Sequence, residues 1–151
     1  MGFKVILDST DVKFSACHFL KEPPQCSRLH GHNYYVSVEI SDILDDNNFV
    51  VDFIDLKEKI ELIVKPMDHH ILIPTLSTDL EIHEENESIE IITSNKRYVF
   101  PRDDVLFLPL KATTSELLAK FIHGKLKEIY KKKRIVVRVR ESKSTMAAFE
   151  E

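Results

Sequence analysis

The run from His32 to Ile40 constrains the fold of this chain most, because apolar and polar side chains alternate along it. Tyr34, Val36, Val38 and Ile40 occupy every second position. Successive side chains of a β-strand point to opposite faces, so these four are predicted to share one face of a strand. A single strand cannot bury that face alone, and the chain must therefore build a sheet with one covered face.

Four other segments also read as strands. The sequence pattern predicts one long strand at residues 3–20 and a short strand at residues 49–53. It also predicts the last strand of the chain at residues 135–141. Residues 82–100 alternate on both sides of a turn at Ser94–Lys96, which predicts a β-hairpin.

Two amphipathic segments are predicted to be helices. The first begins after Asp52, a good capping residue, and ends at Pro66, which cannot continue a helix. The second begins near Thr113, because Thr113 and Glu116 have the spacing of a capping box. Apolar residues recur at helical spacing in both segments, so each has one apolar face. The order of elements predicts an α+β fold, with both helices on one face of an antiparallel sheet.

Composition narrows the class of protein. The 151 residues suggest one domain, and a net charge of −4 argues against a general nucleic-acid binder, which is normally basic. No apolar stretch approaches the roughly 20 residues of a membrane helix, so no membrane partner is expected. Two cysteines in a chain of this size favour reduced thiols and a cytoplasmic protein.

Histidines form the first candidate site. His30 and His32 are two residues apart, so on a strand their rings share a face, with Gly31 pointing the other way. Two imidazoles supply most of a catalytic zinc site, which usually has three protein ligands. Pairing of neighbouring strands could bring His18 beside them as the third. The alternative is a pair of surface or core histidines.

Two further groups could carry acid–base chemistry. Cys26 lies in the loop before the histidines, where a thiolate near cationic groups can act as base or nucleophile, or it is simply a free thiol. Asp68 directly precedes His69, and a carboxylate beside an imidazole can orient the ring for proton transfer. The alternative for this pair is a polar turn after the first helix.

The order of these motifs resembles a known family. FSACHFL, CSRLHGHNY, VVDFIDLKEKI, MDHHILI, TTSELLAKFI and VRVRES follow one another as in the 6-pyruvoyltetrahydropterin synthase and 6-carboxytetrahydropterin synthase family. The likeness covers nearly the whole chain except about residues 75–106. That segment is predicted to be an inserted hairpin, a solvated excursion at a subunit edge, within a single domain of residues 1–151.

The resemblance implies a role for each candidate residue. His18, His30 and His32 would bind Zn²⁺, while Cys26, Asp68 and His69 would transfer protons. Glu141 would hold the pterin ring through two parallel hydrogen bonds, and Thr114 and Ser115 match positions that help to bind it. Candidates for the triphosphate are Lys21, Arg28 and Arg140.

The resemblance also implies an architecture. Family members have the tunnelling fold, a four-stranded antiparallel sheet with two helices on one side. Their subunits form trimers whose sheets make a barrel, and two trimers stack into a homohexamer. The active sites lie between subunits, so Cys26 would act on a pterin held by a neighbouring chain.

The interval between cysteine and histidine indicates the subtype. Three residues separate Cys26 from His30, which is similar to the 6-carboxytetrahydropterin synthases of the 7-deazaguanine (queuosine) pathway. These convert 7,8-dihydroneopterin triphosphate to 6-carboxy-5,6,7,8-tetrahydropterin, acetaldehyde and triphosphate. A subgroup with a glutamate in this loop fits less well, because Ser27 follows the cysteine. Two alternatives remain: a 6-pyruvoyltetrahydropterin synthase, which releases no acetaldehyde, and a pterin- or zinc-binding protein without turnover.

Overall fold

The computed structural model describes residues 2–8 and 11–151, and the chain divides into two compact units. Unit 1 comprises residues up to 14, residues 33–66 and residues 115–151. Unit 2 comprises residues 15–32 and 67–114. Strands β2 (Lys13–His18) and β3 (His30–Asp42) contribute residues to both.

Unit 1 is built on an antiparallel sheet. Strand β9 (Arg134–Arg140) lies between β10 (Met146–Glu150) and β3, while β1 (Phe3–Leu7) pairs with β3. The predicted alternation of β3 is confirmed, since its four apolar side chains are fully buried. In the register of this sheet Val36 lies opposite Val139 and Val38 opposite Val137, so two valine-rich strands form the core.

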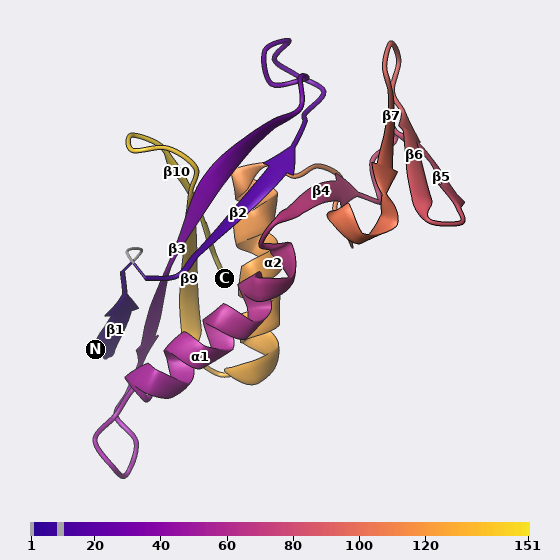
Figure 1. Cartoon of the computed structure of the whole chain (residues 1–151). Coiled ribbons are helices and arrows are strands. Elements are labelled where there is room, and N and C mark those ends of the chain that lie inside the picture. The colour runs from indigo at the N-terminus through magenta and orange to yellow at the C-terminus, as the bar shows by residue number, and fades with distance from the viewer. Residues whose placement is uncertain (1, 9–10) are drawn as a thin grey trace. The chain divides into compact units, whose positions relative to one another are not determined.

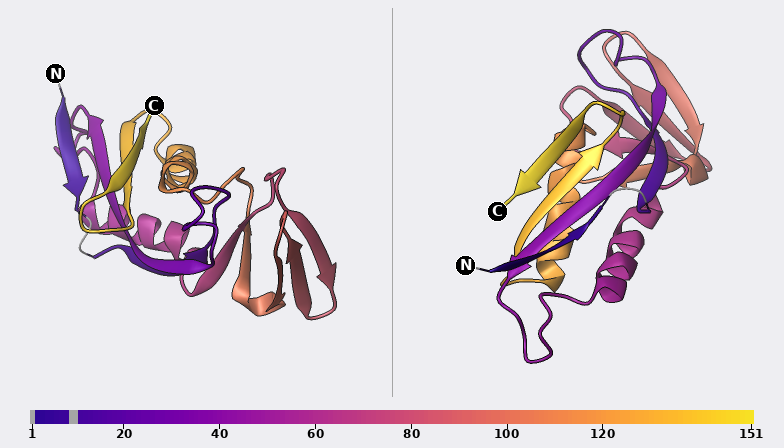
Figure 2. Two further views of the ribbon diagram at one scale, coloured as in Figure 1. Left: turned by 90° about the horizontal axis from the view of Figure 1, so that it is seen from above. Right: turned by 90° about the vertical axis from the view of Figure 1, so that its left-hand side faces the viewer.

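Two helices cover one face of this curled sheet, as Figure 2 shows. Helix α1 (Phe53–Val64) begins at the predicted cap, where the Asp52 carboxylate accepts a hydrogen bond of 2.9 Å from the Asp55 N–H. A short 3₁₀ turn, Lys65–Met67, follows it and contains Pro66. Helix α2 (Ser115–Ile129) buries Leu118, Ile122 and Leu126, which are spaced four residues apart.

Unit 2 contains a parallel arrangement and a separate sheet. Strand β4 (His70–Pro74) pairs in parallel with β2 on one side and with β8 (Val105–Leu108) on the other. The separate sheet has three antiparallel strands in the order β5 (Glu81–Glu85), β6 (Ser88–Ile92) and β7 (Arg97–Pro101) (Figures 1 and 2). A short 3₁₀ turn, Arg102–Asp104, links β7 to β8.

The three-stranded sheet has a core of its own. Ile89 and Ile91 of β6 are fully buried in one cluster with Ile73 and Phe19. The Phe19 ring stacks on Tyr98 with centroids 5.0 Å apart. The expectation of a merely solvated excursion is therefore wrong, because one face of this segment packs against the residue that directly follows His18.

Several local predictions differ from the structure. Residues 3–20 contain two strands, β1 and β2, instead of one. Residues 49–53 form no strand: Val50 and Val51 are buried in a bend, because the Asp45 carboxylate accepts backbone hydrogen bonds that make a turn there. The predicted turn at Ser94–Lys96 is present between β6 and β7, but a third strand, β5, precedes the hairpin. Strands β4 and β8 extend the sheet in parallel, which the expected four-stranded antiparallel sheet did not include.

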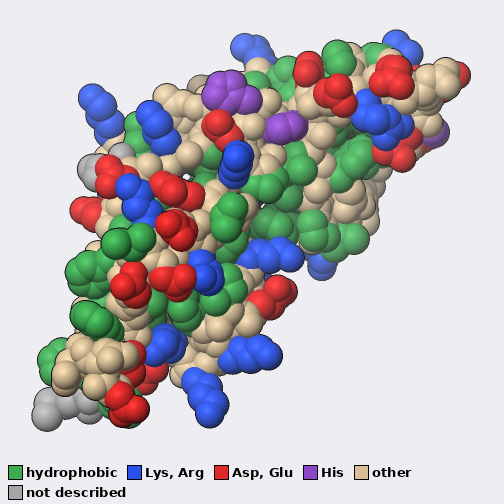
Figure 3. All heavy atoms as spheres, turned by 60° about the horizontal axis from the view of Figure 1, so that its bottom comes forward, with side chains coloured by type: hydrophobic (Ala, Val, Ile, Leu, Met, Phe, Trp, Pro, Cys, Tyr) green, Lys and Arg blue, Asp and Glu red, His purple; other side chains and the backbone are tan. Residues whose placement is uncertain are grey.

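Charge on the molecule is mixed. On the face drawn in Figure 3, lysine and arginine side chains are interspersed with aspartate and glutamate. No helix among the described residues is long and apolar enough to cross a membrane.

Candidate active site

Three histidines converge within unit 2. His18 lies at the end of β2, and His30 and His32 lie at the start of β3. One nitrogen from each ring can be chosen so that all three lie within 4.8 Å of one another. The predicted three-histidine cluster is thus present, with His18 buried and the other two half-buried.

Backbone carbonyls orient two of the rings. The Nδ1 atom of His18 lies 2.9 Å from the Thr113 carbonyl oxygen and 3.2 Å from its Oγ1. The Nδ1 atom of His30 lies 2.6 Å from the Arg28 carbonyl oxygen. A carbonyl only accepts, so each Nδ1 carries a proton and each Nε2 of the neutral ring presents a lone pair. Such a carbonyl contact is the usual support of a metal-ligating histidine.

The geometry of the two lone pairs fits a metal ion. The Nε2 atoms of His18 and His30 are 3.1 Å apart. With both Nδ1 atoms protonated, neither Nε2 can donate to the other, so the contact between neutral rings lacks a proton. Two nitrogens bound to one tetrahedral Zn²⁺ would be separated by about 3.3 Å, given bond lengths near 2.0 Å. The residues present therefore fit zinc, and His32 offers a nitrogen within 4.8 Å of the other two.

Gly31 is required by close packing. A Cβ atom at this position would lie 3.2 Å from the Ala16 carbonyl oxygen and 3.5 Å from the Cys17 Sγ atom. Both atoms belong to β2, the strand that carries His18. Glycine thus allows the start of β3 to approach β2 closely, while its two histidine neighbours point to the opposite face.

Cys26 lies in the loop between β2 and β3 and is half-buried. Its N–H donates to the Pro23 carbonyl and its carbonyl accepts from the Leu20 N–H, both at 2.8 Å. The Lys96 ammonium, from the turn between β6 and β7, donates to the Ser27 carbonyl at 2.8 Å. The loop is therefore held from its own backbone and from the three-stranded sheet.

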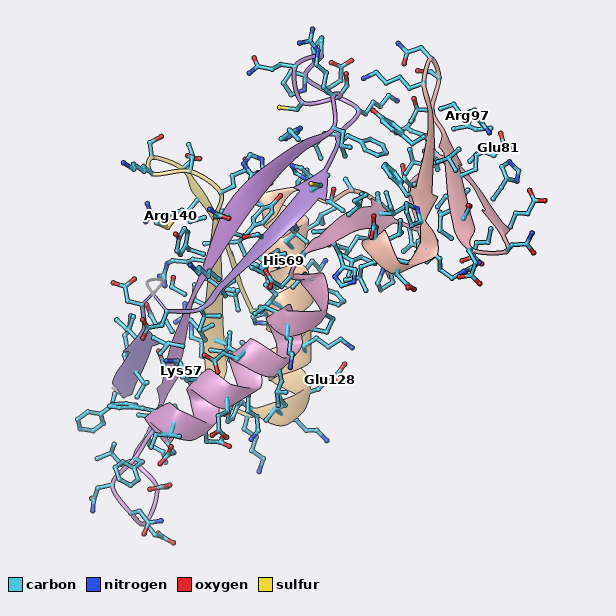
Figure 4. All side chains as sticks on the ribbon, viewed as in Figure 1. Lys57, His69, Glu81, Arg97, Glu128 and Arg140 are labelled. Atoms are coloured by element: carbon cyan, nitrogen blue, oxygen red, sulfur yellow. The ribbon has the colours of Figure 1, made fainter. Side chains whose placement is uncertain are left out.

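Asp68 and His69 form a hydrogen-bonded pair in the turn before β4, and His69 is labelled in Figure 4. One Asp68 oxygen accepts from the Ser15 N–H at 2.8 Å, and the other lies 2.8 Å from Nδ1 of His69. The Ser15 N–H, with a smaller contribution from His69, holds the pKa of Asp68 below its usual value although partial burial opposes this. An ionised Asp68 fixes the proton of His69 on Nδ1 and leaves Nε2 able to accept one.

Strain marks the same turn. His69 has a φ of 59°, in the left-handed region that few residues other than glycine adopt. Its N–H donates to the Ser15 carbonyl at 2.7 Å, and its side chain is 83% exposed. This backbone conformation places the His69 ring in solvent. The His69 N–H and the Asp68 carboxylate remain hydrogen-bonded to Ser15 of β2.

Glu141 and Ser115 form a separate group in unit 1. The Ser115 hydroxyl, at the start of α2, donates to Oε2 of Glu141 at 2.8 Å, just after β9. Ser115 is buried and Glu141 half-buried. Thr114 directly precedes α2 and is the last residue of unit 2. The structure thus pairs two of the predicted pterin-binding residues.

Several contacts in and near the site were not predicted from the sequence. Thr113, expected to cap α2, instead contacts His18, and the helix begins two residues later. Lys21, a candidate for the triphosphate, is paired with Asp79 at 2.9 Å, and Arg140 donates to the Lys143 carbonyl. No sequence pattern identified Lys96 as part of the site, because its partner, Ser27, lies 69 residues away in sequence.

Comparison with known proteins identifies the family. A family model described as 6-pyruvoyl tetrahydropterin synthase matches residues 9–151. A 6-carboxy-5,6,7,8-tetrahydropterin synthase of Aquifex aeolicus is 34% identical over 113 residues, which make up 73% of this chain and 63% of that protein. The 6-pyruvoyl tetrahydropterin synthase of Plasmodium falciparum has a solved structure with a TM-score of 0.92 and 30% identity, covering 99% of this chain and 98% of that one.

A solved structure of the Plasmodium vivax 6-pyruvoyltetrahydropterin synthase also has a TM-score of 0.92, at 29% identity, and covers 100% of this chain and 98% of that one. It is described as a mutant in which a catalytic glutamate is replaced. These likenesses extend over both units and confirm the tunnelling fold predicted from the motifs. The chain is therefore a member of the 6-pyruvoyl tetrahydropterin synthase family.

Proposed function

We propose that this chain is a zinc-dependent 6-carboxy-5,6,7,8-tetrahydropterin synthase. It converts 7,8-dihydroneopterin triphosphate and one water molecule to 6-carboxytetrahydropterin, acetaldehyde and triphosphate. The main support is the convergence of His18, His30 and His32 in the same unit as Cys26 and the Asp68–His69 pair. The name of the Aquifex aeolicus relative favours the carboxy product. Zinc on the three histidines would act as a Lewis acid toward oxygen atoms of the substrate side chain.

The protein's own groups then divide the proton transfers. Cys26, as thiolate, removes a proton from the substrate side chain, and the loop contacts from Pro23 and Leu20 keep it in place. His69 accepts or returns a second proton at Nε2, because Asp68 holds the other ring nitrogen in the protonated form.

Glu141 has the chemistry to recognise the pterin. A carboxylate accepts two parallel N–H bonds from a guanidine-like edge, as it does from arginine. The Ser115 hydroxyl fixes the orientation of this carboxylate at 2.8 Å. Thr114, which directly precedes Ser115 in sequence, is also assigned to binding of the pterin.

The assembly and setting belong to the same proposal. We assign the chain to a homohexamer of two stacked trimers, with each active site between subunits, in the cytoplasm. The product would enter the 7-deazaguanine (queuosine) pathway. Neither nucleic acid nor a membrane is a partner.

A second candidate is 6-pyruvoyltetrahydropterin synthase activity. The solved Plasmodium falciparum enzyme of that name covers 99% of this chain, so residues 75–106 lie within the match. The Aquifex aeolicus relative, by contrast, matches 73% of the chain. The two activities share triphosphate elimination and differ in whether a carbon–carbon bond breaks.

Identification of the products tests the proposal directly. The purified, zinc-loaded protein is incubated with 7,8-dihydroneopterin triphosphate, and pterins and acetaldehyde are measured by mass spectrometry. We expect 6-carboxytetrahydropterin with one acetaldehyde per turnover. A 6-pyruvoyl product without acetaldehyde supports the second candidate, and unchanged substrate that is nonetheless bound points to a pterin-binding protein without turnover.

The same assay tests the base. Cys26→Ala should lower the turnover rate by roughly 10²- to 10⁴-fold. Because a glutamate is catalytic in the Plasmodium vivax protein, Glu22→Gln, in the same loop as Cys26, is the matched comparison. Full activity of Cys26→Ala together with loss in Glu22→Gln would transfer the role of base to the glutamate.

A further inference from the structure

A cavity of about 620 Å³ lies within unit 2, beside the loop that carries Cys26. Its walls come from the β2–β3 loop, the β4–β5 connection, the β6–β7 turn and the segment before α2. Hydroxyl and amide side chains are numerous among the lining residues. These are Ser27, Ser77, Thr78, Thr93, Ser94 and Asn95.

Three ammonium groups border this cavity. Lys21 forms an ion pair with Asp79 at 2.9 Å, so its charge is offset. Lys96 donates to the Ser27 carbonyl at 2.8 Å and lies 3.4 Å from its hydroxyl, neither of which carries charge. Lys111 is exposed, and no residue in ranges 2–8 and 11–151 forms an ion pair or hydrogen bond with its ammonium.

The balance of charge therefore favours an anion. Glu22 is the one carboxylate among the described lining residues besides the paired Asp79. Lys96 and Lys111 keep their positive charge for a ligand, and hydroxyl groups surround them. Lysine acts as a point charge toward phosphate, and neutral O–H and N–H donors complete such a site.

The cavity adjoins the candidate active site along the chain. Phe19, which directly follows His18, contributes to its wall, as does Ser27, which directly follows Cys26. Six residues of the segment that follows His18 thus line the cavity, namely Phe19, Leu20, Lys21, Glu22, Pro24 and Ser27. A substrate whose side chain reaches Cys26 would extend its far end along this loop.

We propose that this cavity binds the triphosphate end of the substrate, with Lys96 and Lys111 as its cationic contacts. The assignment rests on the proposed function for the identity of the ligand, but the site itself recognises any linear polyphosphate. Lys96 also donates to the Ser27 carbonyl, so one side chain contacts both the cavity and the loop that carries Cys26.

Titration calorimetry with inorganic triphosphate tests the site on the full-length, zinc-loaded protein. Lys111→Met and Lys96→Met should each weaken triphosphate binding by roughly tenfold, the effect of losing one charge-assisted contact. Lys132→Met is the matched control, because Lys132 is exposed in the turn after α2 and lies outside the cavity. The Lys132→Met variant should bind triphosphate as tightly as the unmodified protein does.

Several outcomes overturn the proposal. Equal affinity in all three variants would place the triphosphate elsewhere. Triphosphate that removes zinc from the protein would also give equal apparent affinities, and metal analysis after the titration detects that case. Lys111 is exposed and its ammonium forms no ion pair or hydrogen bond with a described residue, so a loss of affinity in Lys111→Met at unchanged thermal midpoint cannot be attributed to unfolding.

Two further arms separate this site from the proposed function. A nucleoside triphosphate that binds as tightly as 7,8-dihydroneopterin triphosphate, and is equally sensitive to Lys111→Met, would overturn the assignment to the pterin substrate. If the protein does not turn over dihydroneopterin triphosphate but inorganic triphosphate still binds through Lys96 and Lys111, the proposed function fails and the anion site stands.

Discussion

At the scale of single residues, the histidine cluster shows how backbone groups orient the rings of a candidate metal site. The Thr113 and Arg28 carbonyls hold the Nδ1 protons of His18 and His30. The two Nε2 atoms lie 3.1 Å apart, and with both Nδ1 atoms protonated each Nε2 can be a metal ligand. The arrangement is preorganised, because the support of each ring comes from a neighbouring loop.

Removal of one ligand should abolish zinc binding. In His30→Ala, we expect zinc measured by mass spectrometry to fall from about one per chain to a small fraction, because three protein ligands are the usual minimum for a catalytic site. His83→Ala is the matched control: His83 lies in the same unit, is half exposed, and its ring contacts only Glu81, at 2.6 Å, among the contacts seen in the described chain. Equal zinc in both variants would contradict the assignment of the cluster.

The sequence predicted the three histidines but not what supports them. Spacing places His30 and His32 on one face, and strand pairing brings His18 near. Thr113 lies 95 residues from His18, and its spacing to Glu116 indicated a helix cap. Local patterns carry no information about such a long-range partner, so this contact emerged only from the fold.

At the scale of elements, strand β3 is buried on both faces in its central part. Its apolar face lies in the core, while Ser37 and Glu39 on the other face are 8% and 9% exposed. Glu39 bridges two neighbouring strands: it lies 2.7 Å from the Lys4 ammonium of β1 and 3.2 Å from the Arg138 guanidinium of β9. Buried carboxylates require such partners.

This bridge predicts a pH-dependent contribution to stability. The Lys4 ammonium, opposed by burial and aided by Arg138, holds the pKa of Glu39 below its usual value of 4.5. A carboxyl whose pKa is lowered by folding stabilises the native state above its unfolded pKa, and this contribution is lost as pH falls through the lower folded value. Glu39→Gln should therefore lower the free energy of unfolding at pH 7 by about 1–2 kcal/mol, since Lys4 is largely exposed and solvent weakens the pair.

Urea denaturation at several pH values measures this effect. The difference between Glu39→Gln and the unmodified chain should shrink as the pH falls below 4.5 and vanish once the pH lies well below the lowered pKa of Glu39, because both side chains are then neutral. Glu128→Gln is the control, because Glu128 is exposed on α2 (labelled in Figure 4). A constant difference between pH 7 and pH 3 would show that the ion pairs do not contribute.

Elements with strong periodicity or capping were predictable, and those set by pairing were not. Asp52 and Pro66 bracket the first helix, and β3 alternates as expected. Strand β4 has a buried continuous run, Leu72–Pro74, and pairs in parallel on both sides. A short apolar run does not distinguish parallel from antiparallel neighbours, so its place in the sheet could not be derived.

At the scale of the whole molecule, the two compact units carry different parts of the proposed chemistry. Unit 2 contains the histidine cluster, Cys26 and the Asp68–His69 pair, whereas unit 1 contains Glu141 with Ser115. In an assembly with active sites between subunits, Cys26 and Glu141 of one site would come from different chains. This arrangement can be tested without a structure of the assembly.

Mixing of two inactive variants provides the test. Cys26→Ala and Glu141→Ala are each expected to be inactive; the two variants are mixed, dissociated and then reassembled together. If each site uses Cys26 of one chain and Glu141 of another, random assembly gives about a quarter of the sites with both residues, and that share of activity returns. If each site uses both residues of one chain, no activity returns, because every chain lacks one of them.

The sequence alone determined the class of fold, the two helices, the alternating strand and the set of candidate residues. These follow from periodicities, caps and motif spacing, which act over a few residues. Only the tertiary structure decided that Thr113 supports His18, that Lys96 reaches the Cys26 loop, and that residues 81–101 form a three-stranded sheet packed on Phe19. Each of those contacts joins residues far apart in the chain. These contacts are selected by burial and by the need to satisfy hydrogen bonds. Local propensity does not predict them.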